Sequence, residues 1–222
     1  MKRKFDWVLF GIVLAFLPYR LGAEEGWRPL FNGKDLSGWE HVGPGSFVVE
    51  DGMLKTVGGM GLLWYTREKI GNSVLRVVYK ATHREDNAGV FIRISDAPPD
   101  EWFAVHNGYE VQILEQPPPN MPNDPWHTTG AIYSISKATS RPSKPAGEWN
   151  TIEITLDGPR TLVMLNGEKV NDFREGDPIP PRKNWFEPQR RPRREAGYIG
   201  LQNHHAGAEV YFKEVLVKPL AK

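Results

Sequence analysis

Apolar and polar residues alternate along many short segments of this chain, which is typical of strands with one face in a core. Asn166 and Gly167 separate two of these segments, and both residues tolerate the positive φ of a tight hairpin turn. No window of ten or more residues shows a helical period. The pattern therefore predicts an all-β sandwich or barrel. The predicted strands are 46–50, 53–57, 62–66, 73–80, 88–94, 108–114, 130–136, 151–156, 161–165, 168–171, 198–203 and 209–217.

The segment 108–115 carries the most information about function. In a strand, Tyr109, Val111 and Ile113 point to one face, and Glu110 and Gln112 point to the other. If the apolar face lies in the core, the opposite face presents a carboxylate and an amide side by side.

Two other predicted strands repeat this arrangement. In 90–94, Arg93 lies opposite the apolar set of Val90, Ile92 and Ile94. In 198–204, Gln202 and His204 lie opposite Ile199 and Leu201. If these strands are neighbours of 108–114 in one sheet, their polar faces merge into a site.

Two long segments are rich in proline and are predicted to be loops. Residues 115–126 leave the Glu110 strand, and residues 172–196 enter the Gln202 strand. Proline lacks the N–H that a strand donates, and long loops in a compact domain are commonly functional. We expect both loops to form walls beside the site.

The N-terminal residues have the features of a secretory signal peptide. Lys2, Arg3 and Lys4 precede an apolar run at 7–17, and small residues follow at 21–23. The run is too short for an ordinary membrane span, although a retained N-terminal anchor is the alternative. We predict a signal peptide at 1–23, a single domain at 24–222, export to the periplasm or the extracellular space, and no stable membrane insertion afterwards.

The charge of the chain argues against a nucleic-acid partner, and its cysteine content excludes disulfide bonds. Without residues 1–23, which hold four basic residues and one acidic residue, the formal net charge changes from +1 to −2. This balance gives no electrostatic case for nucleic acid. The chain has no Cys and therefore no disulfide. The oligomeric state is left open by the sequence.

The chain resembles the 3-keto-disaccharide hydrolase domain family over nearly all of its length beyond residue 23. The segments that carry the resemblance, in the family's order, are 30–39, 87–93, 108–114, 129–133, 147–150, 165–167 and 200–204. The resemblance implies a concanavalin A-like jelly-roll sandwich of two antiparallel sheets, export from a bacterial cell, and cleavage of 3-keto glycosides. The expected ligand is therefore a small carbohydrate.

A ketone at C3 of a sugar acidifies the hydrogen at C2, so cleavage needs a base, a stabilised C3 oxygen and a proton source. We assign Glu110 or His204 as the base and Tyr133 as the donor to the leaving group. The expected clamp on the C3 oxygen and the hydroxyl groups is Arg93 with Gln112. Other expected substrate-binding residues are Gln202, Asn87 and Trp126, of which Trp126 would stack on a sugar face.

Each assignment has an alternative. Arg93 and Glu110 could form a structural ion pair, and His204 could simply end a strand. Glu110, Gln112 and His204 could also hold a divalent cation, whose identity and need the sequence leaves open. The whole domain could be a non-catalytic, lectin-like carbohydrate-binding module. An ordinary glycosidase needs two facing carboxylates, and only Glu115 in the first loop could partner Glu110.

Overall fold

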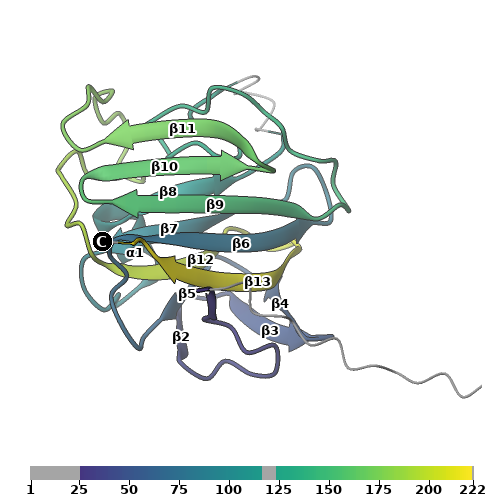
Figure 1. Cartoon of the computed structure of the whole chain (residues 1–222). Helices are drawn as coiled ribbons and strands as arrows, with labels where there is room; N and C mark the ends of the chain where they lie inside the picture. Colours follow the sequence, from purple (N-terminus) through teal and green to yellow (C-terminus); the bar gives the residue numbers. More distant parts are fainter. Residues whose placement is uncertain (1–25, 117–123, 222) are drawn as a thin grey trace, which may run out of the picture.

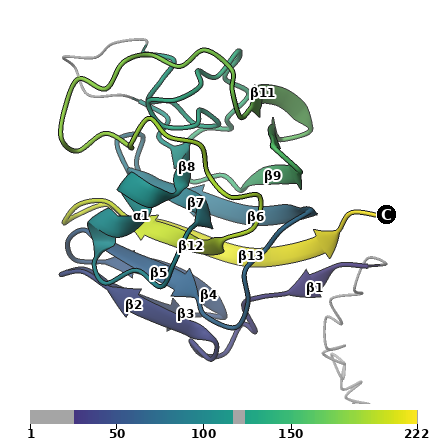
Figure 2. The ribbon, with the colours of Figure 1, turned by 90° about the vertical axis from the view of Figure 1, so that its left-hand side faces the viewer.

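A computed structural model describes residues 26–116 and 124–221. The predicted signal peptide at 1–23 lies outside the described residues and stays a prediction. The described chain forms two antiparallel sheets packed face to face (Figures 1 and 2). One sheet has the order β11 (Glu168–Arg174), β10 (Arg160–Leu165), β9 (Asn150–Asp157), β6 (Ser73–Ala81), β13 (Val210–Pro219), β4 (Met53–Val57) and β3 (Ser46–Glu50), and β1 (Arg28–Pro29) also pairs with β13. The other has the order β2 (Trp39–Val42), β5 (Gly61–Tyr65), β12 (Tyr198–Asn203), β7 (Ala88–Ile94) and β8 (Tyr109–Ile113).

The core lies between the two sheets and is built by the alternation seen in the sequence. In β8, Tyr109, Val111 and Ile113 all belong to the central buried cluster. In β12, Ile199 and Leu201 belong to the same cluster. The predicted all-β sandwich of two antiparallel sheets is confirmed.

The five-stranded sheet is also covered on its outer face. A second apolar cluster there includes Leu62, Trp64 and Phe91, and the helix α1 (Glu101–Asn107) packs against it. Asp100 caps this helix by accepting a hydrogen bond of 2.8 Å from the N–H of Phe103. With only seven residues, α1 is too short to show a helical period in the sequence. No helix among the described residues is long and apolar enough to span a membrane.

The hairpin prediction is confirmed, and the strand predicted at 130–136 is wrong. Asn166 and Gly167 both have positive φ, at 51° and 83°, between β10 and β11. Within 130–136, only isolated bridges from Ile132 to Val111 and to Ser136 form. Gly130 and Ser134 have φ of 86° and 57°, which is incompatible with one extended strand.

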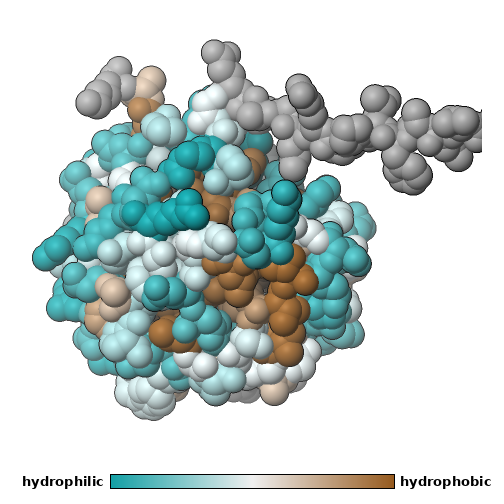
Figure 3. Space-filling model, turned by 90° about the horizontal axis from the view of Figure 1, so that it is seen from below, coloured by the Kyte–Doolittle hydropathy of each residue, from teal (hydrophilic) through white to brown (hydrophobic). Residues whose placement is uncertain are grey.

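The surface is mostly hydrophilic in the view of Figure 3, with hydrophobic residues gathered near the centre of that face. The large hydrophobic side chains of the described residues that are exposed are Val48, Val57, Trp185 and Phe186. The first two belong to β3 and β4, and the last two lie in the loop after β11. The second pair lines the pocket described next.

Candidate functional site

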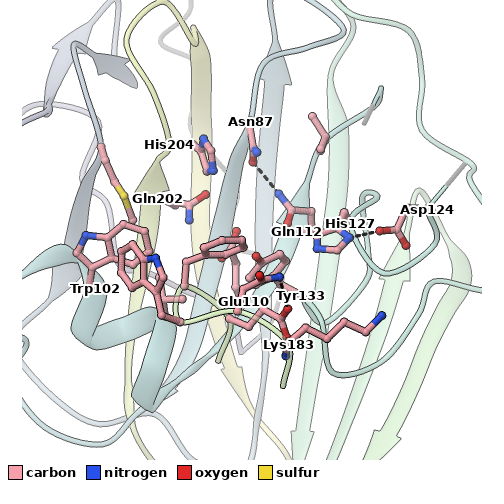
Figure 4. Close-up of a pocket in the computed structure, with 17 residues that line it drawn as sticks. Asn87, Trp102, Glu110, Gln112, Asp124, His127, Tyr133, Lys183, Gln202 and His204 are labelled. Carbon is pink, nitrogen blue, oxygen red and sulfur yellow. Dashed lines mark hydrogen bonds and ion pairs between the residues drawn. The ribbon is translucent and has the colours of Figure 1, made fainter. Parts of the chain in front are cut away.

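A pocket of about 660 Å³ lies on the outer face of the five-stranded sheet (Figure 4). Its floor contains Glu110 and Gln112 from β8 and Gln202 from β12. The predicted merging of polar faces is therefore found for these two strands. The strand between them is β7, which pairs with both.

Gly89 of β7 creates the space in which the floor residues meet. It pairs with Gln112 on one side and with Gln202 on the other. A Cβ at this position would lie 2.5 Å from Oε1 of Glu110 and 2.6 Å from its Cγ. The Glu110 side chain therefore occupies the volume that any larger residue at position 89 would need.

The floor carboxyl of Glu110 is only 6% exposed. Burial raises the pKa of Glu110 to about 8, and hydrogen bonding with the Gln202 side chain opposes part of this rise. The carboxyl is therefore mostly protonated at pH 7. A carboxyl whose pKa is strongly raised inside a pocket is a candidate functional group.

The two floor amides are held differently. Nε2 of Gln112 donates to Oδ1 of Asn87 at 2.7 Å and to the carbonyl of Ala88 at 3.3 Å. Oε1 of Gln202 is buried and has no hydrogen-bond partner among the described residues. Buried acceptors are rarely left unpaired, so this oxygen is suited to accept a hydroxyl group of a ligand.

One wall of the pocket carries a histidine–aspartate pair that the sequence analysis missed. Nδ1 of His127 is hydrogen-bonded to Oδ2 of Asp124, and Oδ1 of Asp124 accepts the N–H of Trp126 at 2.9 Å. The imidazole is turned toward the floor (Figure 4). The spacing of three residues was a signal, but it lies in a loop with no strand period to orient it.

Tyr133 stands beside this pair. Its N–H donates to the carbonyl of Glu110 at 2.8 Å, so backbone pairing with β8 fixes its position. Its ring meets that of His127 edge to face, with 4.9 Å between ring centroids. Burial, followed by the nearby Glu110, raises the pKa of Tyr133, and the phenol keeps its proton.

Arg93 is not in the pocket, contrary to the sequence prediction. Its backbone has φ of 56° and forms a β-bulge, where the pairing of β7 with β12 shifts register. Ile94 therefore joins Phe91 on the outer face instead of sharing the core face of Ile92. The Arg93 side chain donates to three backbone carbonyls at one end of the sandwich, those of Gly158, Arg160 and Arg194.

The clamp of Arg93 with Gln112 and the alternative ion pair of Arg93 with Glu110 are both absent from the described structure.

The sequence prediction for Trp126 is also wrong. This residue does not line the pocket, and it contributes the backbone N–H that holds Asp124. The pocket-lining tryptophans are Trp102 and Trp185.

His204 lies at the mouth of the pocket. The residue is exposed, and its ring points inward (Figure 4).

The predicted cation site has no clear ligand set. Among residues 26–116 and 124–221, no three His, Cys, Asp or Glu side chains gather closely enough to hold a metal ion. Glu110 and His204 share the pocket as predicted, with Gln112. The requirement for a cation stays an open prediction.

The opposite wall comes from the second long loop, as predicted. Glu187 anchors it by accepting hydrogen bonds from Ser134 at 3.1 Å and Arg190 at 2.7 Å. Arg193, 7% exposed, donates to the carbonyl of Gly108 and lies over the Tyr109 ring, 4.8 Å from its centroid. These arginines hold a proline-rich segment against the sheet.

An antiparallel sandwich with amides, a protonated carboxyl and a histidine around one pocket suits a ligand rich in hydroxyl groups, and the family match places the chain in a carbohydrate-related class. The chain belongs to the 3-keto-alpha-glucoside-1,2-lyase-like domain family, whose model matches residues 26–218. A search among curated proteins found no match.

Solved structures agree with this class. A protein of Parabacteroides distasonis ATCC 8503 with the provisional name glycosyl hydrolase is 28% identical, with a TM-score of 0.70 over 87% of this chain and 99% of its own. A second such protein of that organism is 25% identical, with a TM-score of 0.70 over 89% and 95%. A Bacillus subtilis protein of unknown function with a galectin-like fold, 10% identical with a TM-score of 0.63 over 86% and 94%, shares the fold.

Proposed function

We propose that the protein cleaves the glycosidic bond of 3-keto glycosides by elimination followed by hydration. The observation that carries this proposal is Glu110, a buried carboxyl that is neutral at pH 7 and faces a pocket with an oriented histidine. A protonated carboxyl and an imidazole in one pocket supply an acid and a base for chemistry near neutral pH. Membership of the lyase-like family supports the keto sugar as substrate.

The elimination step needs two proton transfers, and the hydration step needs two more. A base removes the C2 proton, whose electrons form an enolate with the C3 ketone. The enolate then restores the C3 carbonyl and forms a C1–C2 double bond as the bond from C1 to the glycosidic oxygen breaks. That oxygen takes a proton and departs as an alcohol. Water then adds its oxygen to C1 and a proton to C2, which gives net hydrolysis.

The residues of the pocket divide these tasks. His127, with Nδ1 bound to Asp124, presents its other nitrogen as the base at C2. Glu110, protonated at pH 7, donates to the leaving oxygen. Tyr133, next to His127, donates a hydrogen bond to the C3 oxygen as negative charge develops there. This division differs from the sequence-based assignment, which had Glu110 or His204 as the base and Tyr133 as the acid. Glu110 is moved to the role of acid because its carboxyl is mostly protonated at pH 7.

The floor amides bind the sugar. Gln112 is fixed by Asn87, and the free Oε1 of Gln202 accepts a hydroxyl group. His204 at the mouth offers a further ring nitrogen to the sugar. We also propose that the protein acts outside the cytoplasm after cleavage behind Ala23, which N-terminal sequencing of the exported protein would test.

The activity is tested by incubating the protein with 3-keto-trehalose, 3-keto-lactose and their unoxidised parents, with and without chelator, and following products by NMR. We expect cleavage of keto substrates alone. Glu110→Gln should lower turnover by about 10²–10⁴-fold, whereas Glu168→Gln, at the exposed start of β11, should not. Binding without any product would favour the carbohydrate-binding module, and cleavage of the parents would favour an ordinary glycosidase.

A further inference from the structure

One wall of the pocket is aromatic and open to solvent. Trp102 of α1 and Trp185 of the second loop are in contact, with 4.7 Å between ring centroids, and Phe186 meets Trp185 edge to face at 6.0 Å. Trp185 is 64% exposed and Phe186 is 39% exposed. We call these three residues the aromatic wall. Exposed aromatic side chains inside a pocket indicate a surface that a ligand covers.

The aromatic wall is held in place before any ligand binds. The carbonyl of Trp185 accepts a hydrogen bond of 2.9 Å from Nε2 of His106 and a second from the Arg182 guanidinium. The His106 ring also stacks on Trp102, at 6.2 Å. His106 thus joins helix α1 to the backbone that carries Trp185, which positions the exposed ring.

The pocket is divided into a polar half and an aromatic half. In Figure 4, Trp102 lies on one side of Glu110, and His127 with Asp124 lies on the other. The keto sugar needs the half with His127, because its C2 proton and C3 oxygen require His127 and Tyr133, and Gln112 lies in the same half to bind its hydroxyl groups. The aromatic half then faces the group on the other side of the glycosidic oxygen.

We infer that the aromatic wall binds a flat aromatic leaving group, so that the preferred substrates are aryl 3-keto glycosides. This inference rests on the proposed function. A pocket of about 660 Å³ has room for a ligand of two rings, one in each half. The wall offers indole and phenyl faces but no side-chain hydrogen-bond acceptor, so an aryl ring can cover it fully, whereas a second sugar would bury hydroxyl groups there without acceptors.

Binding of unoxidised probes separates this inference from catalysis. The probes are 4-nitrophenyl α-glucoside, methyl α-glucoside and trehalose, measured by titration calorimetry with the full chain. We expect the aryl glucoside to bind at least tenfold more tightly than the other two. Trp185→Ala should remove this advantage and leave the affinity for methyl α-glucoside unchanged. Trp149→Ala, an aromatic change outside the pocket, should alter neither affinity, and circular dichroism verifies folding of each variant.

Equal affinities for the three probes would overturn the inference, as would an aryl preference that survives a Trp185→Ala, Phe186→Ala double variant. A loss of trehalose affinity as large as the loss of aryl affinity would make the wall a sugar subsite instead. Cleavage of 3-keto disaccharides without any aryl preference would leave the proposed function standing and reject only the inference. Aryl binding without cleavage of any keto glycoside would reject the proposed function and retain the aromatic subsite.

Discussion

Replacing Glu110 with Gln should make the folded protein more stable as the pH rises, relative to wild type. The pKa of Glu110 is raised from 4.5 to about 8 by burial. Each tenfold change in a protonation equilibrium corresponds to about 1.36 kcal/mol. Ionising this carboxyl in the folded protein therefore costs up to about 5 kcal/mol more than ionising it in the unfolded chain.

The sign follows from the two protonation states. Between pH 4.5 and 8 the unfolded chain has released the Glu110 proton while the folded protein retains it, so the wild-type free energy of unfolding falls as the pH rises. The Gln variant has no proton to release. Its stability relative to wild type should increase by about 1.4 kcal/mol per pH unit within this range and level off above pH 8.

Urea unfolding at several pH values, followed by tryptophan fluorescence, measures this difference. Glu187→Gln is the matched control within the same pocket. Burial alone would raise the pKa of Glu187, but hydrogen bonds from the Lys183 N–H, Asn184 and Ser134, together with Arg190, outweigh burial and lower it. That variant should therefore lose stability relative to wild type at pH 7, and the loss should shrink as the pH falls below 4.5. A Glu110→Gln difference that does not change with pH would refute the burial argument.

Three further predictions concern neighbouring parts of the molecule. Gly89→Ala should lower turnover about tenfold or more, because the new methyl group displaces the Glu110 side chain. The variant should still fold. Steady-state kinetics measure its turnover, and circular dichroism measures its folding. Arg93→Met should reduce the free energy of unfolding by roughly 2–5 kcal/mol, because it leaves backbone carbonyls without hydrogen-bond donors. The kcat of the folded variant should equal that of wild type. A lower kcat with unchanged stability would show that Arg93 acts in the site. The kcat/KM profile should fall tenfold per pH unit above about pH 8, as Glu110 loses the proton that it donates, whereas a rise through pH 8 would make it the base.

The floor of the site could be predicted from the sequence because strands have a fixed period of two. Once Tyr109, Val111 and Ile113 were placed in the core, Glu110 and Gln112 had to face outward. The same argument places Gln202 correctly. Sheet neighbours could not be deduced from the period alone, but three strands with the same unusual polar face indicated them.

Arg93 was misplaced because a β-bulge reverses the alternation at one residue. Such a bulge leaves no mark in the pattern of Val90, Ile92 and Ile94. Asp124 and His127 were missed for a related reason, since loop residues have no period that predicts their direction. Trp126 and Trp185 both lie in predicted loops, and only tertiary packing determines that the second lines the pocket.

Cleavage of a 3-keto glycoside in D₂O, followed by NMR, tests the central claim most directly. Elimination followed by hydration delivers a solvent proton to C2, so the released keto sugar should carry deuterium at C2 from the first time point. Incubation of authentic product with Glu110→Gln measures the exchange that occurs without cleavage. Product that still carries hydrogen at C2 during initial turnover would show direct displacement at C1, and would contradict the proposed removal of the C2 proton.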